Sequence, residues 1–240
     1  MPCKLCHQEC ELCDSHVIPE FLYSALYDEE HKYYVVSNIH GKSARPFQKG
    51  LRERLLCAAC ETRFSRWETY AANVLYNRDK ARCQKVNDTI LVDGLDYAQF
   101  KLFLLSLIWR AGVSSLPVFQ QTDLGPHEET LRQMLFEGDP GSFDRYGCLV
   151  FAITLDGQPL AGTIYGPQPC SIDTHRCYRL LVRAFLFIYF ISSHRPDDVA
   201  LNEFLTEEGR LRIPVKKLQD AAFLDSMCRE IVAATYGQRT

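Results

Sequence analysis

The sequence predicts an α+β protein that begins with a zinc-binding module and continues into a helical middle and an antiparallel β C-terminal part. Three observations predict this class: two CxxC pairs, three segments in which apolar residues recur with helical spacing, and short apolar runs that end at turn residues. We expect residues 1–90 to form the zinc-binding module and residues 91–240 to form an α+β C-terminal domain.

The composition is that of a globular chain without a membrane span. With 240 residues, of which 47% are hydrophobic, the chain can bury a core. Its longest apolar run, Leu180 to Ile191, contains Arg183 and is too short for a membrane helix. The first residues carry no apolar run and do not fit a secretory signal, so we expect a cytoplasmic location and no membrane partner. In that reducing compartment, eleven cysteines indicate metal ligation before disulfides.

Charge is unevenly distributed along the chain. The net charge is −3, yet residues 41–85 hold eleven lysines and arginines against four acids, which gives this stretch +7. A basic segment beside a metal module is typical of phosphate contacts and predicts a nucleic-acid partner. A solvated helix face is the alternative that the composition leaves open. The basic residues are Lys42, Arg45, Lys49, Arg52, Arg54, Arg63, Arg66, Arg78, Lys80, Arg82 and Lys85.

Two helices and two strands are expected in the first part of the chain. Apolar residues with helical spacing predict a short helix over 20–27, and Tyr33–Val36 predicts a strand within a loop. A helix over Ala58–Tyr76 begins directly at the second CxxC pair. The apolar residues of its buried face are Phe64, Trp67, Ala71, Val74 and Leu75. A short strand lies between Asn87 and Gly94, where Asp93-Gly94 predicts a turn.

Two more helices are expected in the middle of the chain. Residues Tyr97–Val113 carry a broad apolar stripe that includes Phe100, Leu104 and Ile108. The next helix starts at Gly125-Pro126, because proline suits the first turn and the acids that follow favour the positive end of the helix.

After residue 141, the spacing of apolar residues changes from that of helices to that of strands. Leu149–Leu155 predicts a strand, Asp156-Gly157 a hairpin turn, and Leu160–Tyr165 the returning strand. Residues Tyr178–Ser193 are almost wholly apolar, which fits a central strand or a buried helix, and their aromatic and β-branched residues favour the strand. Lys217–Tyr236 predicts a closing helix.

Four cysteines are the predicted zinc ligands: Cys3, Cys6, Cys57 and Cys60. A CxxC pair in a tight turn presents two thiolates to one tetrahedral Zn²⁺, and a second pair completes the site. The last pair opens a helix, whose first-turn amides favour thiolates.

Other cysteines leave alternatives open. Cys10 and Cys13 form a third CxxC pair, which could replace the first pair or hold a second ion with His7. We favour Cys3 and Cys6 because they leave room for a turn and a strand before His16. Farther along, Cys170, His175 and Cys177 could hold another metal, although a loop followed by a core strand also explains them.

His16 carries a resemblance to a known family. The chain has a CxxC pair, then His16 followed by Val-Ile-Pro, then Leu-Leu-CxxC opening a helix. This order resembles the HNH (His-Me finger) endonucleases over about residues 1–80. The resemblance implies a ββα fold on a treble-clef zinc, with His16 as the general base that activates water. It also implies Asp14 and Glu61 near a catalytic Mg²⁺ or Mn²⁺ ion.

Three departures from the family pattern concern the catalytic half of the motif. Ser15 stands where the family usually has an acid before the histidine, and Asp14 lies one residue further back. Glu61 follows the second CxxC where the family commonly has histidine or asparagine. The family's middle asparagine has no counterpart before Cys57. The chain is also similar to bacterial proteins without known activity that share segments matching 109–115 and 124–129 here.

Two functions follow from these observations. The first is a metal-dependent HNH-like endonuclease acting on nucleic acid, in the manner of an antiviral defence protein or a toxin-type effector. Its catalytic residues would be His16, Asp14 and Glu61. The second is a catalytically inactive, zinc-stabilised adaptor that binds a nucleic acid or, through the C-terminal domain, a protein partner. The departures at Ser15 and Glu61 favour the second function, whereas His16, Asp14 and the basic stretch favour the first.

Overall fold

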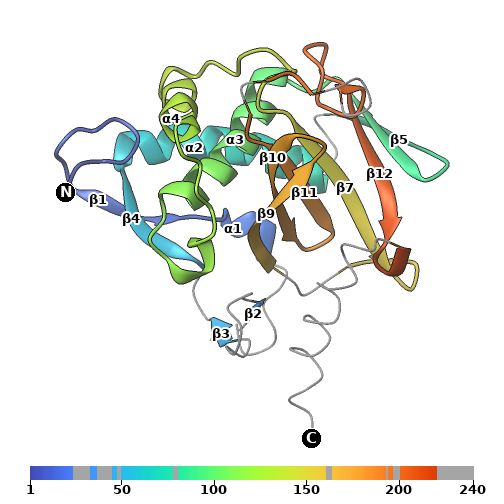
Figure 1. Ribbon diagram of the computed structural model, residues 1–240, viewed down its shortest axis with the longest axis horizontal. Helices are drawn as coiled ribbons and strands as arrows, with labels where there is room; N and C mark the ends of the chain where they lie inside the picture. The colour runs from blue at the N-terminus through green and yellow to red at the C-terminus, as the bar shows by residue number, and fades with distance from the viewer. Residues whose placement is uncertain are drawn as a thin grey trace, which may run out of the picture.

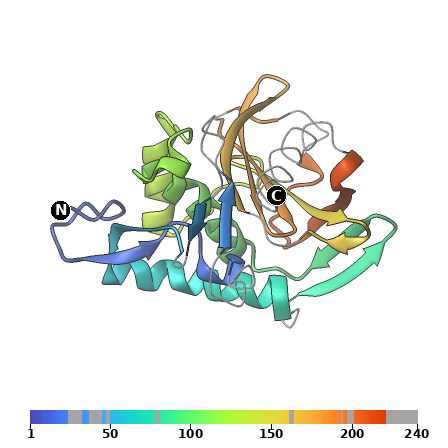
Figure 2. The ribbon, with the colours of Figure 1, turned by 90° about the horizontal axis from the view of Figure 1, so that it is seen from below.

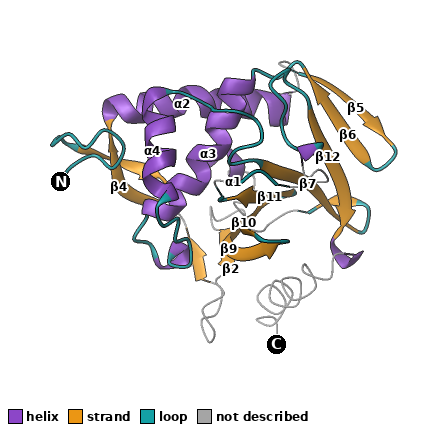
Figure 3. Cartoon of the chain, turned by 45° about the horizontal axis from the view of Figure 1, so that its top comes forward, coloured by secondary structure: helices purple, strands orange, loops and turns teal. Residues whose placement is uncertain are grey.

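The computed structural model describes residues 1–23, 33–36, 45–47, 50–77, 81–160, 164–192, 194–196 and 201–220. Helices and strands occupy separate regions of the molecule, which confirms the α+β class (Figure 3). The helices α2, α3 and α4 pack together, and a large sheet curves beside them. The α-helices of the described residues are α1 (Glu20–Tyr23), α2 (Ala58–Ala72), α3 (Tyr97–Val113) and α4 (His127–Glu137).

A small two-stranded sheet starts the chain. Strand β1 (Leu12–His16) pairs antiparallel with β4 (Arg52–Cys57), and α2 follows β4 without a loop. The register places Leu12 opposite Cys57 and His16 opposite Arg52. Between β1 and β4 the chain passes through α1, β2 and β3, so the two strands of this small sheet are not consecutive in the sequence. This part lies at one end of the molecule (Figure 1).

The large sheet has ten strands, and it recruits them from both halves of the sequence. Its order is β3-β2-β9-β10-β11-β7-β12-β6-β5, with β8 beside β7. The pairs β2–β9 and β7–β12 are parallel and the others antiparallel, so the sheet is mixed. The strands are β2 (Tyr33–Val36), β3 (Arg45–Phe47), β5 (Arg82–Val86), β6 (Thr89–Asp93), β7 (Cys148–Leu155), β8 (Gln158–Pro159), β9 (Ile164–Ile172), β10 (His175–Val182), β11 (Phe185–Phe190) and β12 (Leu211–Lys217).

The central strands are buried on both faces. Along β11, Phe185, Phe187 and Tyr189 pack into the core shared with the helices. Leu186, Ile188 and Phe190 belong to a second cluster on the opposite face, together with Leu201 and Phe204. A strand covered on both sides cannot alternate apolar with polar residues, which explains the continuous apolar run in the sequence.

The apolar run 178–193 is a hairpin rather than the single strand or helix expected. Strands β10 and β11 pair antiparallel from Cys177–Phe190 to Val182–Phe185. The two-residue turn between them contains Arg183, whose φ is 53°. Turns of this kind are usually marked by glycine or asparagine. Because neither stands here, the sequence carries no sign of the turn.

Other elements agree with the sequence or correct it. Helix α3 has the predicted bounds, and Asp96 caps it by accepting a hydrogen bond of 3.0 Å from the Gln99 amide. Helix α2 ends at Ala72 and continues as a π-helical turn to Asn77. The hairpin turn at Asp156-Gly157 is confirmed, and within the described residues the strand that returns along β7 is Gln158–Pro159. Strand β9, from Ile164, pairs instead with β10 and β2.

The C-terminal part differs most from expectation. Lys217, the expected start of a helix, ends strand β12, and a short 3-10 turn follows at 218–220. The rest of the expected helix lies outside the described residues, as does the end of the one predicted over 20–27. Strand β5 was also not expected. It forms with β6 a hairpin that projects at the end of the molecule opposite the N-terminus (Figure 2).

No helix among the described residues is long and apolar enough to cross a membrane. The proposed boundary near residue 90 falls inside strand β6, whose neighbours in the sheet are β5 and β12. The main core likewise joins residues of α2 and α3. The two predicted domains therefore share a sheet and a core.

Candidate metal centre

Two local structures bring the four cysteines together. Cys3 and Cys6 lie in a tight turn that is closed when the His7 amide donates to the Cys3 carbonyl at 2.9 Å. His7 has a φ of 61°, the left-handed conformation that reverses the chain. Cys57 is the last residue of β4 and the N-cap of α2, and Cys60 lies in the first turn of that helix. Pairing of β1 with β4 carries the first turn to the start of the helix.

The four thiols are spaced as a tetrahedral metal site requires. Their sulfur atoms all lie within 4.8 Å of one another, and the sulfur atoms of Cys6 and Cys57 are 3.9 Å apart. Four sulfurs at the usual Zn–S distance form a tetrahedron with edges of about 3.8 Å. Cys3 and Cys60 are buried, and Cys6 and Cys57 are half-buried. This donor set could hold a metal ion such as zinc.

The thiols of this cluster differ in acidity. Burial raises the pKa of Cys57, but hydrogen bonds from the Cys60 amide and from the neighbouring thiols outweigh it and lower the pKa to about 7. Burial raises the pKa of Cys60, and the hydrogen-bonded thiols of Cys57 and Cys3 raise it further. One thiolate is therefore easily formed beside thiols that hold their protons. A bound cation would displace those protons, so binding should release them.

The alternative cysteine groups are not assembled in the same way. Across the described ranges, the four-cysteine cluster is the one group of three or more potential ligands close enough to share an ion. Cys10 donates to the Gln8 carbonyl at 3.2 Å and does not join it. Cys170 and Cys177 are opposite each other on β9 and β10 but do not form such a group with His175.

His16, the predicted base, lies at the end of β1 beside charged groups. Its Nε2 atom is 3.7 Å from a carboxylate oxygen of Glu20, and the side chain is 21% exposed. Nε2 itself is buried and has no hydrogen-bond partner among the described residues. Burial, followed by the guanidinium of Arg52, lowers the pKa of His16, while Glu20 and Glu68 oppose that shift. The imidazole is therefore neutral at pH 7 and has a lone pair to accept a proton.

The two predicted catalytic carboxylates have different surroundings. Asp14 is exposed and forms an ion pair of 3.4 Å with Arg52. Glu61 has a buried carboxylate oxygen without a partner among the described residues. Burial raises the pKa of Cys13, and the charge of Glu61 raises it further. The carboxylate of α2 that acts on the imidazole is Glu68, which favours a higher pKa of His16. Asp14, His16 and Glu61 therefore do not form a ready-made metal site.

Ser15 has a structural role in the pairing of β1 with β4. Its side chain is buried, and its hydroxyl oxygen accepts a hydrogen bond of 3.2 Å from the Leu56 amide. Side chains alternate along a strand, so Ser15 faces the opposite side from Asp14 and His16. An acid at this position would be buried, which is costly without a cation partner.

Residues that the sequence reasoning missed join the metal module to the helices that follow. Arg110 of α3, which is 1% exposed, donates to the carbonyl of His16 at 2.7 Å. Arg132 of α4 donates to the carbonyl of Leu5 at 2.5 Å. A cation within an apolar helix is the signal that could have identified Arg110, because a buried arginine needs partners for its donors.

A second missed contact lies at the end of α3. Ser114 and Ser115 follow this helix, and both hydroxyls donate to the carboxylate of Glu53, at 2.7 Å and 2.5 Å respectively. The Ser115 amide donates to the same carboxylate at 2.9 Å. These contacts attach strand β4 to the C-terminal end of α3.

The predicted basic stretch is only partly free to meet a ligand. Arg54, Arg66, Arg82 and Lys85 are exposed. Arg52 is engaged by acids, and Arg63 donates to the Phe136 carbonyl. Strand β3 includes Arg45, whose side chain is not described. The remaining basic residues of the stretch, Lys42, Lys49, Arg78 and Lys80, lie outside the described residues.

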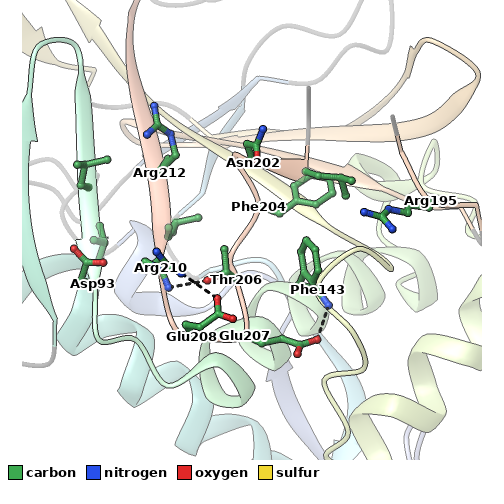
Figure 4. A pocket seen from close by; sticks show the side chains of 14 residues that line it. Asp93, Phe143, Arg195, Asn202, Phe204, Thr206, Glu207, Glu208, Arg210 and Arg212 are labelled. Atoms are coloured by element: carbon green, nitrogen blue, oxygen red, sulfur yellow. Dashed lines mark hydrogen bonds and ion pairs between the residues drawn. The ribbon is translucent and has the colours of Figure 1, made fainter. Parts of the chain in front are cut away.

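A cavity of about 660 Å³ lies beside β6 and β12 (Figure 4). Phe143 and Phe204 form part of its apolar wall. Its three arginines are each within 4.0 Å of a carboxylate, and three acids line it as well. The charges of its walls balance, so the cavity has no marked preference for an anion or a cation. It contains none of the residues predicted to be functional.

A scan against protein-family models, a search of curated proteins and a search of solved structures each returned no match to this chain.

Proposed function

We propose that the protein is a zinc-stabilised, HNH-like endonuclease that cleaves nucleic acid, with His16 as its general base. The observation that carries the proposal is the position of His16. This imidazole, whose pKa is lowered mainly by burial, ends strand β1 at the opposite end of the β1–β4 pair from Cys57. It lies close enough to α2, the helix that the cluster opens, for Glu68 of that helix to act on it. Neutral histidine is the usual side chain for abstracting a proton near pH 7.

In the proposed reaction, His16 takes a proton from water as the oxygen attacks phosphorus. The bond from phosphorus to the leaving sugar oxygen breaks, and that oxygen leaves with a proton from solvent. Glu20, 3.7 Å from the imidazole, would stabilise the imidazolium. Exposed Arg54 and Arg66 would contact the phosphate backbone. Zinc at Cys3, Cys6, Cys57 and Cys60 would hold the N-terminal turn to the start of α2.

The proposed mechanism includes no catalytic Mg²⁺ or Mn²⁺ ion, and these ions are varied only in the assay. Asp14 is paired with Arg52, and Glu61 acts on Cys13 rather than on His16. Because these carboxylates do not meet at His16, we derive no step through a second metal. Endonuclease activity of this kind would suit the defence or toxin-type role that the family resemblance implies.

The test is a cleavage assay on plasmid, linear DNA and RNA. It is run with Mg²⁺, with Mn²⁺ and with EDTA, and the exposure to EDTA is kept too short to remove zinc. The wild type is compared with His16→Ala after both are shown to contain equal zinc. Loss of a general base lowers the rate about 10²- to 10⁴-fold. His127→Ala is the matched control, because His127 is also a partly buried neutral histidine but lies on α4. Equal cleavage by His16→Ala and wild type would overturn the proposal.

A non-catalytic adaptor is the second candidate, and one observation favours it: the Nε2 atom of His16 is buried. A base whose nitrogen water cannot reach does not abstract its proton. In this case the zinc module would be a scaffold, and the partner would be a nucleic acid or a protein bound through the C-terminal part. Absence of cleavage on every substrate, with retained zinc and retained binding of DNA or RNA in a gel-shift assay, would favour this candidate.

A further inference from the structure

Arg110 is a buried cation that connects three elements. It belongs to α3, and its Nη1 atom lies 2.7 Å from the carbonyl oxygen of His16 and 2.7 Å from a carboxylate oxygen of Glu68. Its Nε atom donates to the Ser106 carbonyl at 3.2 Å, which fixes the guanidinium to its own helix. The guanidinium also lies over the Phe64 ring, 5.3 Å from its centroid. A single side chain thus joins β1, α2 and α3.

These contacts have a cost that a purely apolar residue would avoid. Taking a guanidinium out of water is unfavourable unless an opposite charge and good acceptors replace the water. Glu68 supplies the charge, and its side chain is 23% exposed. Apolar packing of α3 against α2 would be served as well by leucine or methionine. The charged group is therefore explained by what it holds, which is the backbone of His16.

We propose that Arg110 and Glu68 form a positioning pair for His16, in which the guanidinium holds the His16 carbonyl and the carboxylate holds the guanidinium. The pair fixes the end of β1 and thereby the place of the imidazole beside Glu20 and Arg52. Its contribution to catalysis rests on the proposed nuclease function, whereas its contribution to the placement of His16 does not.

The charges of the pair also act on the imidazole, with opposite signs. Glu68 favours the protonated imidazole of His16, and Arg110 disfavours it. Arg52 and Glu20, the groups nearest on β4 and α1, act in the same two directions and are left unchanged. Removal of Glu68 and removal of Arg110 should therefore change the titration of His16 in opposite directions.

The experiment follows the His16 imidazole by NMR in the full chain, in wild type, Glu68→Gln and Arg110→Met, with zinc content and Tm measured for each. We expect Glu68→Gln to lower the pKa of His16 and Arg110→Met to raise it. Lys101→Met is the matched control, because Lys101 is equally buried on the same helix but donates to Tyr97 and to the loop at 142–145. It should leave the titration of His16 unchanged.

Shifts of the same sign in both variants, or no shift in either, would overturn the proposal. A merely loosened structure would bring the pKa of His16 toward about 6.5 in every variant, Lys101→Met included. If Arg110→Met does not fold, Glu68→Gln decides alone, because it keeps an acceptor for the guanidinium and removes only the charge.

Cleavage gives a separate result. If the wild type cleaves nucleic acid, we expect Arg110→Lys, which keeps the charge but loses the fork of donors, to lose about 10- to 100-fold in rate. Unchanged cleavage by a zinc-replete Arg110→Lys protein would contradict the catalytic part. If the wild type cleaves nothing, the nuclease proposal fails, while the titration still decides whether the pair positions His16.

Discussion

At the scale of single residues, the four cysteines illustrate how little of a metal site must be assembled by distant parts of a chain. Each CxxC pair is local, and only the pairing of β1 with β4 is needed to bring Cys3 and Cys6 to Cys57 and Cys60. Cys60 is buried, and burial together with the neighbouring thiols raises its pKa, so its thiolate forms least readily unless a cation is bound. Without a cation, this position holds a neutral thiol.

We expect Cys60→Ser to lower the metal content of the purified protein from about one ion per chain to a small fraction of that, because serine is a poor ligand for zinc. Zinc is measured by mass spectrometry after extensive dialysis. Cys83→Ser is the matched control, since Cys83 is exposed on β5 and outside the cluster. An equal metal content in Cys60→Ser and wild type would contradict the assignment of the site.

His127 gives a pH prediction. Burial, then Arg176 and Arg145, lower its pKa in the folded protein, and its Nδ1 atom lies 3.0 Å from the Tyr146 hydroxyl. The unfolded chain, with a pKa of about 6.5, takes up the proton more readily. The stabilisation is therefore present above about pH 6.5 and is lost as the pH falls through the folded pKa.

We expect the free energy of unfolding to decrease less between pH 7 and pH 5 in His127→Gln than in wild type. Urea denaturation at a series of pH values measures this difference. A steeper decrease in the variant would show that the sign is wrong.

At the scale of elements, α3 is the centre of the molecule. Twelve of its residues, from Phe100 to Ala111, are buried, including the cations Lys101 and Arg110. Lys101 donates to the Tyr97 hydroxyl at 3.1 Å and to the Arg145 carbonyl at 2.8 Å, so it anchors the loop that precedes β7. Burial lowers the pKa of Lys101 to about 8, although nearby acids oppose this. Arg110 and the two serines anchor the module on the other side.

The contact of α3 with strand β4 can be tested by removing both hydroxyls. Charge-assisted hydrogen bonds contribute about 1.5–3 kcal/mol each, and the amide of Ser115 remains as one donor. We expect Ser114→Ala with Ser115→Ala to lower the free energy of unfolding by about 2 kcal/mol or more in urea denaturation. The exposed Ser65→Ala on α2 should change it by less than about 0.5 kcal/mol. A double variant as stable as the control would mean that Glu53 is fully hydrated in solution.

At the scale of the whole molecule, the metal module and the large sheet are joined by charged contacts and by one core. Arg110 and Arg132 hold backbone carbonyls of the module, and Glu53 holds the end of α3. The core continues from Cys3 and Leu5 through Phe64 and Trp109 to Phe187. If the four cysteines bind a metal ion, its removal should destabilise the sheet as well as the N-terminal part.

We expect removal of zinc by a chelator to lower the Tm and to leave a single cooperative transition. The transition is followed by far-UV circular dichroism for the sheet and by fluorescence of Trp67 and Trp109, which lie in α2 and α3. Coincident transitions indicate one cooperative unit. Two separated transitions, with the sheet unaffected by the chelator, would instead support independent domains divided near residue 90.

Features that depend on neighbours in the sequence were predictable. The bounds of α3 and the start of α2 follow from helical periodicity, and the turn at Asp156-Gly157 follows from residues that tolerate positive φ. The two CxxC pairs indicate their common site because the ligand spacing is a covalent property of the chain. Each of these patterns could be recognised in the sequence because it is complete within a few neighbouring residues.

Features that depend on distant partners required the tertiary structure. Strands β5 and β12 and the parallel pairs of the sheet could not be read from the sequence, because pairing depends on which strands meet. The same holds for the surroundings of His16: Glu20, Arg52, Glu68 and Arg110 come from four separate elements. The α+β class, the main helices and the four thiols could be predicted because they depend on spacing along the chain. Which carboxylates approach His16, and which cation binds its carbonyl, depends on folding, since electrostatic contacts form only between groups that folding brings together.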